Sequence, residues 1–365
     1  MKKVLLVFGT RPEAIKMCPL VNELKKSNKF LVKICVTGQH KEMLQQVLDV
    51  FKVVPDYDLE IMQPNQTLST ITTNILDKIK PVFEDYEPDV VLVHGDTTTT
   101  FAASLAAFYA GIKVGHVEAG LRTYNLKSPF PEEFNRQAVS ILSDFNFAPT
   151  NVSKNHLLSE GKKVENIFVT GNTAIDALKT TVDSSYHHDL FDWVNDSKLI
   201  MITAHRRENL GQPMKNMFKA IKRVLTENPD VKAIYPIHKN PLVRNAAKEI
   251  FGDDDRLKLI EPLEVIDFHN FLNRSYLILT DSGGIQEEAP SLGKPVLVMR
   301  DTTERPEGVS AGTLKLVGTE EENIYENFTL LLTDDEEYAK MSQASNPYGD
   351  GTASQQIVKI LAENL

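Results

Sequence analysis

Acidic side chains follow two buried strands that the sequence predicts in the first half of the chain. Asp96 lies just beyond the almost wholly apolar run Asp89–Val93, and Glu118 lies just beyond the run Ile112–His116. Carboxyl ends of parallel strands meet at one edge of a sheet, where open α/β sheets bind their ligands. Two carboxylates from successive strands at one edge therefore indicate a candidate ligand site. The alternative is that each is only a cap or turn residue.

Basic side chains occupy the corresponding place after the first predicted strand. Arg11 lies in the turn that follows Val4–Phe8, and Lys16 lies on the helix that comes next. Two cations at this position could neutralise a diphosphate without a metal ion. The turn lacks the G-x-G-x-x-G pattern, so no dinucleotide cofactor is expected. Taken alone, the two cations could equally be solvated surface charges.

A glycine turn in the second half favours binding of a phosphate group. Ser282–Gly284 separates the apolar run Tyr276–Leu279 from a short helix that begins at Ile285. Glycines allow close approach of the backbone to an anion, and the N–H groups of the first helical turn point at it. Glu288, about one turn into the helix, could accept both hydroxyls of a ribose. The alternative is an ordinary tight turn.

Four further side chains have both a functional and a structural interpretation. Glu132 and Arg136 are spaced i, i+4 on the helix after a proline-rich loop, and they could form only a surface ion pair. His205 follows the predicted strand Lys198–Thr203, at the place that Arg11 has in the first half. Phe268 could stack on a base or belong to the core.

The order of predicted elements indicates two α/β domains with doubly wound parallel sheets, because 365 residues are too many for one typical core. We predict an N-terminal domain over residues 1–172 and a C-terminal domain over residues 173–350. The final helix, 351–365, is expected to pack back towards the N-terminal domain. A polar stretch over 171–195 is expected to link the two domains, and Leu68–Tyr86 is predicted to be one long amphipathic helix.

Composition excludes several functional classes. The net charge of −10 argues against a nucleic-acid surface. No apolar run approaches the roughly 18 residues of a membrane span, and the apolar start is too short for a signal peptide. The two cysteines are too few for a disulfide framework or a thiolate metal site, which suits the cytoplasm. His187 and His188 lack a regular ligand spacing, so no metal is predicted.

Motifs along the chain carry a family resemblance. The segments GTRPE, HGDTTTT, HVEAGLRT, P-E-E-x-N-R, TAHRREN, DSGGIQEEA and DTTERPEG occur in this order. Together they resemble the non-hydrolysing UDP-N-acetylglucosamine 2-epimerases over essentially the whole length. The resemblance implies two Rossmann-like domains facing a cleft, in the arrangement called GT-B. It also implies reversible conversion of UDP-GlcNAc to UDP-ManNAc, which supplies ManNAc for bacterial surface polysaccharide such as teichoic acid.

The family's reaction expels UDP, removes the C2 proton to give 2-acetamidoglucal, and then adds UDP back with a proton delivered to the other face. No cofactor is needed. By resemblance, the acid/base candidates are Asp96, Glu118 and Glu132, with His205 near the phosphates. The resemblance also implies a substrate-binding set: Arg11, Lys16, Arg136, Leu263, Phe268, Ser282, Gly283, Gly284, Glu288 and Arg305. Which carboxylate serves which face stays open.

The resemblance further implies a homodimer and a second UDP-GlcNAc site that activates the enzyme. Gln39, Glu132, Arg206 and His238 match that second site. Glu42 and Asn65 stand where some relatives have Gln and Arg, which puts the strength of activation in doubt. The alternatives are a retaining GT-B glycosyltransferase, a hydrolysing epimerase and a non-catalytic UDP-sugar sensor.

Overall fold

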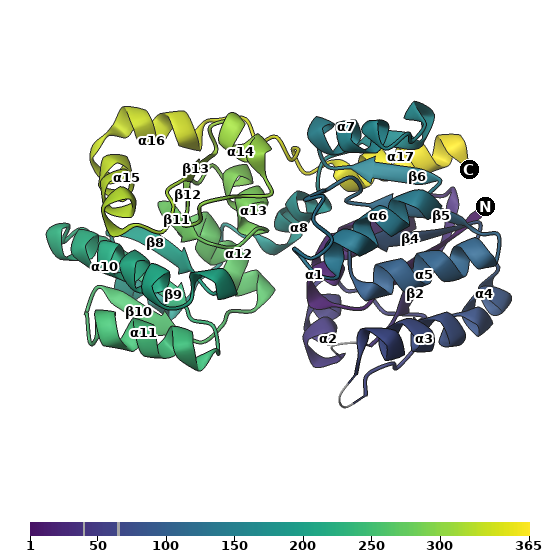
Figure 1. Cartoon of the computed structure of the whole chain (residues 1–365), viewed down its shortest axis with the longest axis horizontal. Helices are drawn as coiled ribbons and strands as arrows, with labels where there is room; N and C mark the ends of the chain where they lie inside the picture. The colour runs from purple at the N-terminus through teal and green to yellow at the C-terminus, as the bar shows by residue number, and fades with distance from the viewer. Residues whose placement is uncertain (39–40, 64–65) are drawn as a thin grey trace. The chain divides into compact units, whose positions relative to one another are not determined.

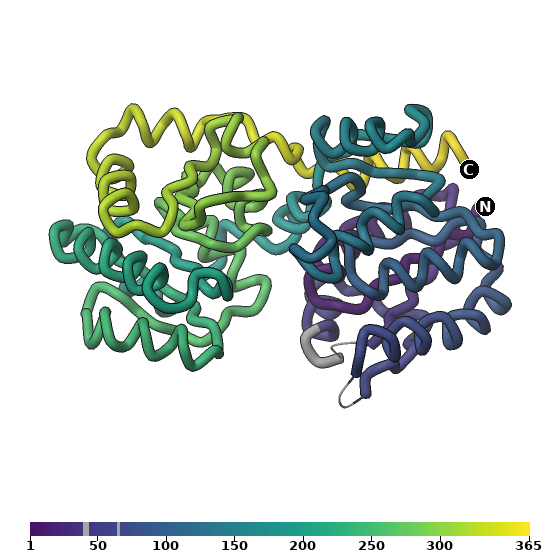
Figure 2. The backbone as a smooth tube through the Cα atoms, in the orientation of Figure 1, coloured from purple at the N-terminus to yellow at the C-terminus, as the bar shows by residue number. Residues whose placement is uncertain are grey.

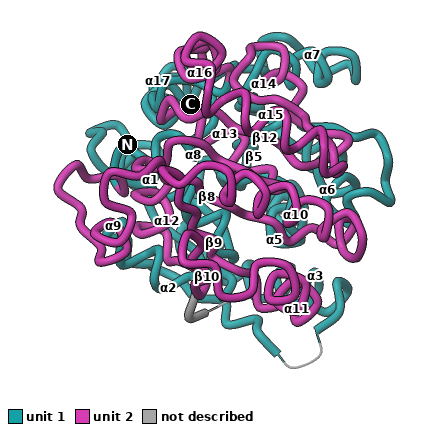
Figure 3. Tube along the Cα trace, turned by 90° about the vertical axis from the view of Figure 1, so that its left-hand side faces the viewer, with its two compact units in different colours: residues 1–180, 348–365 teal, residues 181–347 magenta. Residues whose placement is uncertain are grey.

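Each half of the chain builds its own parallel sheet in the computed structural model, which describes residues 1–38, 41–63 and 66–365 (Figure 2). Two compact units result (Figure 3). Unit 1 comprises Met1–Thr180 and Tyr348–Leu365, and unit 2 comprises Thr181–Pro347. The division falls after Thr180, a few residues beyond the predicted boundary at 172, because helix α8 (Thr173–Thr181) packs with unit 1.

Unit 1 contains a seven-stranded sheet in the order β3-β2-β1-β4-β5-β6-β7. Its strands are β1 (Lys2–Phe8), β2 (Phe30–Val36), β3 (Tyr57–Asp58), β4 (Val90–His94), β5 (Lys113–Val117), β6 (Phe145–Ala148) and β7 (Ile167–Val169). Besides α8, its helices are α1 (Arg11–Lys26), α2 (Lys41–Val50), α3 (Leu68–Lys78), α4 (Lys80–Tyr86), α5 (Thr98–Tyr109), α6 (Glu132–Leu142), α7 (Asn151–Ser159) and α17 (Ala353–Asn364). The strand order reverses between β1 and β4, so a crevice is expected at their carboxyl ends.

The apolar run of β1 supplies both faces of this sheet. Val4 and Leu6 pack in a core with α1 and α17, whereas Leu5 and Val7 pack in a second core with α3, α4 and α5. A strand covered on both faces reads as a continuous apolar run, because alternate side chains enter different cores. Figure 1 shows the helices on the two faces.

Unit 2 repeats this topology in a six-stranded sheet of order β10-β9-β8-β11-β12-β13. Its strands are β8 (Lys198–Thr203), β9 (Val231–Pro236), β10 (Leu257–Ile260), β11 (Leu277–Thr280), β12 (Val296–Val298) and β13 (Leu314–Leu316). Its helices are α9 (Asp189–Val194), α10 (Gln212–Glu227), α11 (Pro241–Phe251), α12 (Val265–Arg274), α13 (Ile285–Ser291), α14 (Pro306–Ser310), α15 (Glu321–Thr333) and α16 (Asp335–Ser342). The equivalent reversal lies between β8 and β11. Two parallel α/β sheets confirm the predicted fold class.

One expectation about secondary structure was wrong. The predicted single helix Leu68–Tyr86 is two helices, α3 and α4, which meet at Ile79. Pro81 lies in the first turn of α4, and its missing amide cannot continue the hydrogen bonds of α3. The predicted crossover over 171–195 contains the division between the units at Thr180, and this stretch includes the helices α8 and α9.

Helix α17 brings the end of the chain back into unit 1. Ile357 and Leu361 are fully buried in the core that contains β1 and α1. The carboxylate of Asp176 on α8 accepts hydrogen bonds from the amides of Ala353 (3.2 Å) and Ser354 (2.7 Å) at the start of α17. Charge-assisted capping of this kind fixes where the helix begins.

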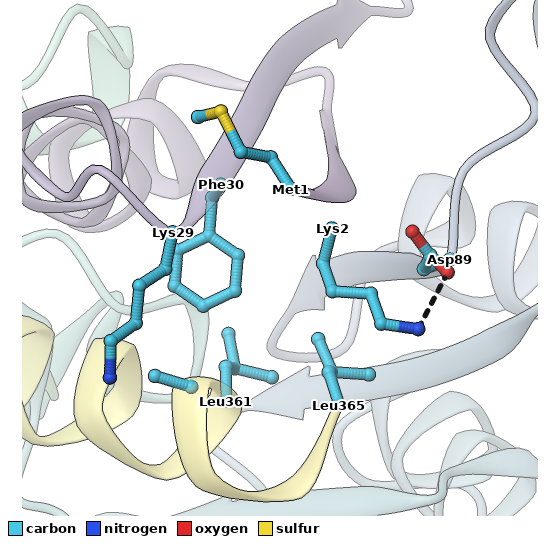
Figure 4. A pocket seen from close by; sticks show the side chains of 8 residues that line it. Met1, Lys2, Lys29, Phe30, Asp89, Leu361 and Leu365 are labelled. Atoms are coloured by element: carbon cyan, nitrogen blue, oxygen red, sulfur yellow. Dashed lines mark hydrogen bonds and ion pairs between the residues drawn. The ribbon is translucent and has the colours of Figure 1, made fainter.

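A hollow of about 480 Å³ lies at the amino-terminal ends of β1, β2 and β4, beside the end of α17 (Figure 4). Its lining includes Phe30, Leu361 and Leu365, and Lys2 pairs with Asp89 at 3.1 Å beside it. Lys16, Asp96, Glu118 and Arg136, which were predicted as site residues, instead lie at the carboxyl-terminal edge of the same sheet. Among the described residues, no helix is both long and apolar enough to cross a membrane.

Candidate active site

A buried carboxylate joins the two loops at the strand reversal of unit 1. One oxygen of Glu13 accepts hydrogen bonds from the amides of Gly9 (3.0 Å) and Thr10 (2.7 Å), after β1. Its other oxygen accepts one from the hydroxyl of Thr97 (2.7 Å), after β4. Glu13 is 2% exposed, so it fixes both loops from below the surface. The sequence analysis missed this role, although Thr10-x-x-Glu13 is a readable capping box.

Asp96 and Arg136 form a direct ion pair at this edge. Arg136 donates from Nε (2.8 Å) to Oδ2 of Asp96, and its Nη2 lies 2.7 Å from the same oxygen. Its Nη1 donates to buried Glu133 at 3.3 Å. Burial alone would lower the pKa of Arg136, but the charges of Asp96 and Glu133 raise it. Arg136 is therefore a fixed cation beside Asp96.

The expected Glu132–Arg136 pair is wrong, because the neighbouring Glu133 takes that place. Glu133 accepts from the amides of Thr123 (2.9 Å) and Tyr124 (3.0 Å) as well as from Arg136. Glu132, the first residue of α6, is partly exposed. Consecutive glutamates point 100° apart on a helix, so helical spacing alone could not choose between them.

Glu118 lies in a crowded, polar setting. Its Oε2 accepts hydrogen bonds from Nζ of Lys16 and from Nδ2 of Asn172 (2.9 Å), and it lies 3.6 Å from Nε2 of His94. Burial alone would raise the pKa of Glu118, but the charges of Lys16 and His94 hold it well below its ordinary value. Its backbone has a φ of 64°, an unusual value for a non-glycine residue. The carboxylate is therefore ionised, and the fold holds it in a strained position.

The open side of Glu118 faces Gly95. A Cβ built on Gly95 would meet only Oε1 of Glu118 within 4 Å, at 3.7 Å. Gly95 has a φ of 66°, which suits glycine. The two oxygens of Glu118 therefore differ in their surroundings: Oε2 accepts hydrogen bonds from Lys16 and Asn172, whereas Oε1 lies on the side of Gly95. Arg11, the first residue of α1, is partly buried at the same edge of the sheet.

Buried Asp281 organises the equivalent edge of unit 2. Its carboxylate accepts hydrogen bonds from the amides of His205 (2.9 Å) and Arg206 (2.9 Å), and Nδ1 of His205 lies 3.7 Å away. His205 stacks on His238, with ring centres 5.5 Å apart. Burial lowers the pKa of His205, and Asp281 opposes that effect. The loop after β8 therefore takes its shape from an acidic residue at the end of β11.

The glycine turn of unit 2 packs against Arg305. A Cβ on Gly283 would lie 2.7 Å from Nη1 of Arg305, so a side chain there would displace the guanidinium. Arg305 donates from Nε to Glu287 at 2.6 Å, and its Nη1 lies 3.3 Å from Glu304. Burial alone would raise the pKa of Glu304, but Arg305 and Arg300 lower it to about 2. A guanidinium beside the Ser282–Gly284 backbone adds a cation to the predicted phosphate site.

The predicted nucleoside residues lie around α12 and α13. Glu288, on α13, is largely buried and lies 3.7 Å from Nε2 of His269. Phe268 and Leu263 are partly buried against the core that contains α12 and α13. Their arrangement leaves part of each side chain accessible to a ligand.

The residues predicted for the activating site divide between described and undescribed positions. Gln39 and Asn65 lie outside the described residues, and so does the side chain of Glu42, which is part of α2. Arg206 pairs with Glu304 at 3.4 Å, and His238 stacks on His205. In unit 2, the activating set and the substrate set therefore share contacts.

One group in the described part of the chain has the spacing of metal ligands. His187, Asp189 and Asp192 offer ligand atoms within 4.8 Å of one another, and all three are exposed. Nε2 of His187 lies 3.5 Å from Asp192. This arrangement is an ordinary solvated ion pair on the surface, and it lies on α9 and the residues before it.

The structure thus brings Lys16, Asp96, Glu118 and Arg136 together in unit 1. In unit 2 it brings together His205, the Ser282–Gly284 turn and Arg305. The sequence analysis missed the residues that hold these groups: buried Glu13, His94, Glu133, Asn172, Asp281 and Glu287, and half-buried Glu304. Glu13 has its capping box, and Glu133 and Glu304 lie three and four residues from a cationic partner. No local sequence signal identifies the others, because their partners are distant in the chain.

Comparisons with known proteins agree over the whole length. The family model described as UDP-N-acetylglucosamine 2-epimerase matches residues 22–362. The UDP-N-acetylglucosamine 2-epimerase of Bacillus subtilis (strain 168) is 65% identical over 359 residues, which cover 98% of this chain and 94% of that protein. A crystal structure of a UDP-N-acetylglucosamine 2-epimerase is 63% identical, has a TM-score of 0.92 and covers 99% of this chain and 96% of that one.

A structure of the Neisseria meningitidis UDP-GlcNAc 2-epimerase bound to UDP-GlcNAc is also similar. It is 54% identical, has a TM-score of 0.90 and covers 99% of this chain and 100% of that one. The predicted resemblance is therefore confirmed, and this chain belongs to the UDP-N-acetylglucosamine 2-epimerase family.

Proposed function

We propose that this protein reversibly epimerises UDP-GlcNAc at C2 of the sugar to give UDP-ManNAc. The observation that carries the proposal is the pair of cation–carboxylate contacts in unit 1, Lys16–Glu118 and Arg136–Asp96. Such an edge offers two proton-transfer groups and two cations, which an elimination of UDP requires. Membership of the epimerase family and the N. meningitidis complex with UDP-GlcNAc support this substrate.

In the proposed first step, the C1–O bond breaks and the electron pair leaves with UDP. A carboxylate of unit 1 takes the proton from C2, and the C–H electrons form the double bond of 2-acetamidoglucal. In the reverse addition, the UDP oxygen bonds to C1 while C2 receives a proton on the opposite face. Atoms and charge balance without an external oxidant, so the steps use no nicotinamide cofactor.

Each candidate carboxylate of unit 1 is paired with a cation, and this pairing affects proton transfer. The low pKa of Glu118 keeps it ionised, so it can accept a proton, although its pairing with Lys16 makes it a weak base. If a substrate phosphate takes over Lys16, the pKa of Glu118 will rise towards a useful value. Arg136 forms the corresponding ion pair with Asp96. Anion binding and proton transfer are thus coupled through shared cations.

Unit 2 supplies the proposed UDP site. The Ser282–Gly284 backbone and Arg305 bind phosphate, with His205 close by, Glu288 binds the ribose hydroxyls, and Phe268 with the backbone near Leu263 binds uracil. The positive charge and N–H dipoles stabilise the departing diphosphate. The neutral ring that a lowered pKa gives His205 can accept or donate a hydrogen bond there.

We further propose that the protein forms a homodimer and binds UDP-GlcNAc at a second, activating site that includes Arg206 and His238. Arg206 pairs with Glu304, which pairs with Arg305, so an anion at Arg206 would change the charge balance beside the phosphate site. Cytoplasmic location and a role in surface polysaccharide stay predictions from the sequence and the resemblance.

Proton NMR with UDP-GlcNAc in D₂O tests the reaction. Deuterium at C2, with UDP-ManNAc growing to a reversible equilibrium, is the expected result. Free ManNAc and UDP would instead indicate a hydrolysing epimerase. Tight UDP binding without exchange would contradict the proposal and favour a glycosyltransferase awaiting its acceptor or a UDP-sugar sensor.

A further inference from the structure

Hydrogen bonds of Asn172 connect otherwise separate parts of unit 1. Its side-chain Nδ2 donates to Oε2 of Glu118 at 2.9 Å, and its Oδ1 accepts from the amide of Ala174 at 2.9 Å. Its backbone amide donates to the carbonyl of Tyr348 at 2.8 Å. Asn172 is 3% exposed, so water does not replace these contacts readily. Its side chain cannot move without changing the position of Glu118.

Tyr348 is the first residue of unit 1 after the chain returns from unit 2. The returning chain lies tightly on the residues next to Asn172. A Cβ on Gly349 would lie 3.2 Å from Cα of Gly171, and a Cβ on Gly171 would lie 3.0 Å from the carbonyl oxygen of Tyr348. Two glycine backbones in contact leave no side chain to absorb a displacement.

Helix α8 anchors both ends of this contact. Asn172 precedes α8 directly, and Asp176 on α8 caps α17 through the amides of Ala353 and Ser354 (Figure 1). The crossover residues 348–354 are therefore held at two points, one at Asn172 and one at Asp176. Of these two residues, Asn172 is the one that also contacts a candidate acid/base residue, Glu118.

We propose that Asn172 is a positioning residue that couples Glu118 to the crossover at Tyr348–Gly349. A change in the path of the returning chain reaches the Glu118 carboxylate through one side chain. Asn172 also holds Oε2, which leaves Oε1 on the side of Gly95 for proton transfer. The inference rests on the proposed acid/base role of Glu118.

The charged and titratable groups around Glu118 define what Asn172 can change. Lys16 on α1, His94 at the end of β4, His116 on β5 and Arg136 on α6 all interact with Glu118. Asn172 is neutral and donates a hydrogen bond to Glu118. Its replacement by alanine removes a hydrogen bond to the ionised carboxylate without changing the formal charge. The pKa of Glu118 should therefore rise in the Asn172→Ala variant.

The first experiment compares Asn172→Ala with Asn22→Ala, a control whose amide donates to the carbonyl of Phe51 at 3.2 Å, away from Glu118. Asn172→Ala should lower kcat roughly 10- to 100-fold, because small misplacements of catalytic groups cost that much. UDP affinity should stay within about twofold, and the acidic limb of the kcat–pH profile should move to higher pH. Asn22→Ala should retain the wild-type values.

Asn172→Asp provides a variant of almost unchanged size if the alanine variant does not fold. A second carboxylate beside Glu118 should move the acidic limb further to higher pH than alanine does. An unchanged kcat and pH profile in a folded Asn172 variant would overturn the positioning role.

The coupling to the crossover is tested with Gly349→Ala and the control Gly351→Ala. Both glycines have positive φ, at 110° and 78°. A Cβ on Gly349 presses on Gly171, whereas a Cβ on Gly351 presses on the flexible end of Lys179. Gly349→Ala should lower kcat several-fold more than Gly351→Ala, and combining it with Asn172→Ala should cost little beyond Asn172→Ala alone. Additive losses would overturn the coupling.

The variant Glu118→Gln separates this inference from the proposed function. Full turnover in Glu118→Gln would mean that the acid/base assignment of Glu118 is wrong. Loss of turnover in Glu118→Gln together with wild-type behaviour of Asn172→Ala would mean that only the role of Asn172 is wrong.

Discussion

The two units share a strand order but differ in what they place at the strand reversal. In unit 1, side-chain charges dominate, as in the pairs Lys16–Glu118 and Arg136–Asp96. In unit 2, buried Asp281 organises backbone amides, and a glycine turn packs on Arg305. The same topology thus provides the place, and the residues at the loop decide between proton transfer and anion binding.

The difference follows from where the carboxylates point. Asp96 and Glu118 direct their oxygens to the cationic side chains of Arg136 and Lys16, whose partners can change when an anion arrives. Asp281 directs its oxygens to its own neighbouring loop and is 0% exposed, so it is structural. Exchangeable partners suit catalysis, whereas fixed partners suit a preorganised binding loop.

The substitution Asp96→Asn should have the largest effect. It removes a proton-transfer group and half of the Arg136 pair, so turnover should fall about 10²- to 10⁴-fold. UDP affinity should change little, because the proposed UDP site lies in unit 2. Deuterium exchange at C2 and calorimetric titration with UDP measure the two quantities. A loss of UDP affinity as large as the loss of turnover would break the division of labour between the units.

Gly283→Ala should weaken UDP binding roughly 10- to 100-fold, because charge-assisted hydrogen bonds of this kind contribute about that much. The added Cβ would lie 2.7 Å from Nη1 of Arg305 and displace it. The midpoint of thermal unfolding should also fall. Gly284→Ala is the control for stability, since its Cβ would meet only Oε1 of Glu288 within 4 Å, at 3.7 Å. Equal destabilisation by the two substitutions would exclude displacement of Arg305 as the cause.

Glu288→Gln should have a smaller effect on binding, about fivefold to tenfold, because the amide keeps one acceptor for the ribose hydroxyls. The rate constant kcat at saturating substrate should stay near the wild-type value. Titrations with UDP and with inorganic diphosphate distinguish a nucleoside contact from a phosphate contact. If diphosphate binding weakens as much as UDP binding, Glu288 does not act on the ribose.

The acid sensitivity of the two units should differ. Burial lowers the pKa of His116 from 6.5 to about 3. Below pH 6.5 the unfolded chain binds a proton at this histidine that the folded protein does not bind, so the free energy of unfolding falls as the pH falls from 6.5 towards 3. The pKa of Glu304 is lowered from 4.5 to about 2, so its contribution to the free energy of unfolding is lost only as the pH falls from 4.5 to about 2. His116→Gln should flatten the decline of stability below pH 6.5 by roughly 1 kcal/mol per pH unit.

Thermal unfolding of the wild type, His116→Gln and Glu304→Gln between pH 8 and pH 4 provides the measurement. His187→Gln is the control, because this histidine side chain is 64% exposed. A curve for His116→Gln that is parallel to the wild type would show that the buried ring does not set the acid limit of unit 1.

The sequence by itself determined the fold class, the family and most of the charged residues at the sheet edges. Continuous apolar runs such as β1 and β4 identify strands covered on both faces, and the residues after them follow directly. Glycine at 283 was also readable as a close approach, and the resemblance assigned Arg305 to the same site. These features are local, so a single segment contains the information.

Only the tertiary structure decided which residues hold those charges. Glu133 rather than Glu132 contacts Arg136, because the orientation of α6 on the sheet selects one of two adjacent glutamates. Asn172 touches Glu118 across 54 positions of sequence, and His205 depends on Asp281 across 76. Parallel strands bring such residues to one edge only when the sheet assembles, and no local pattern records that register.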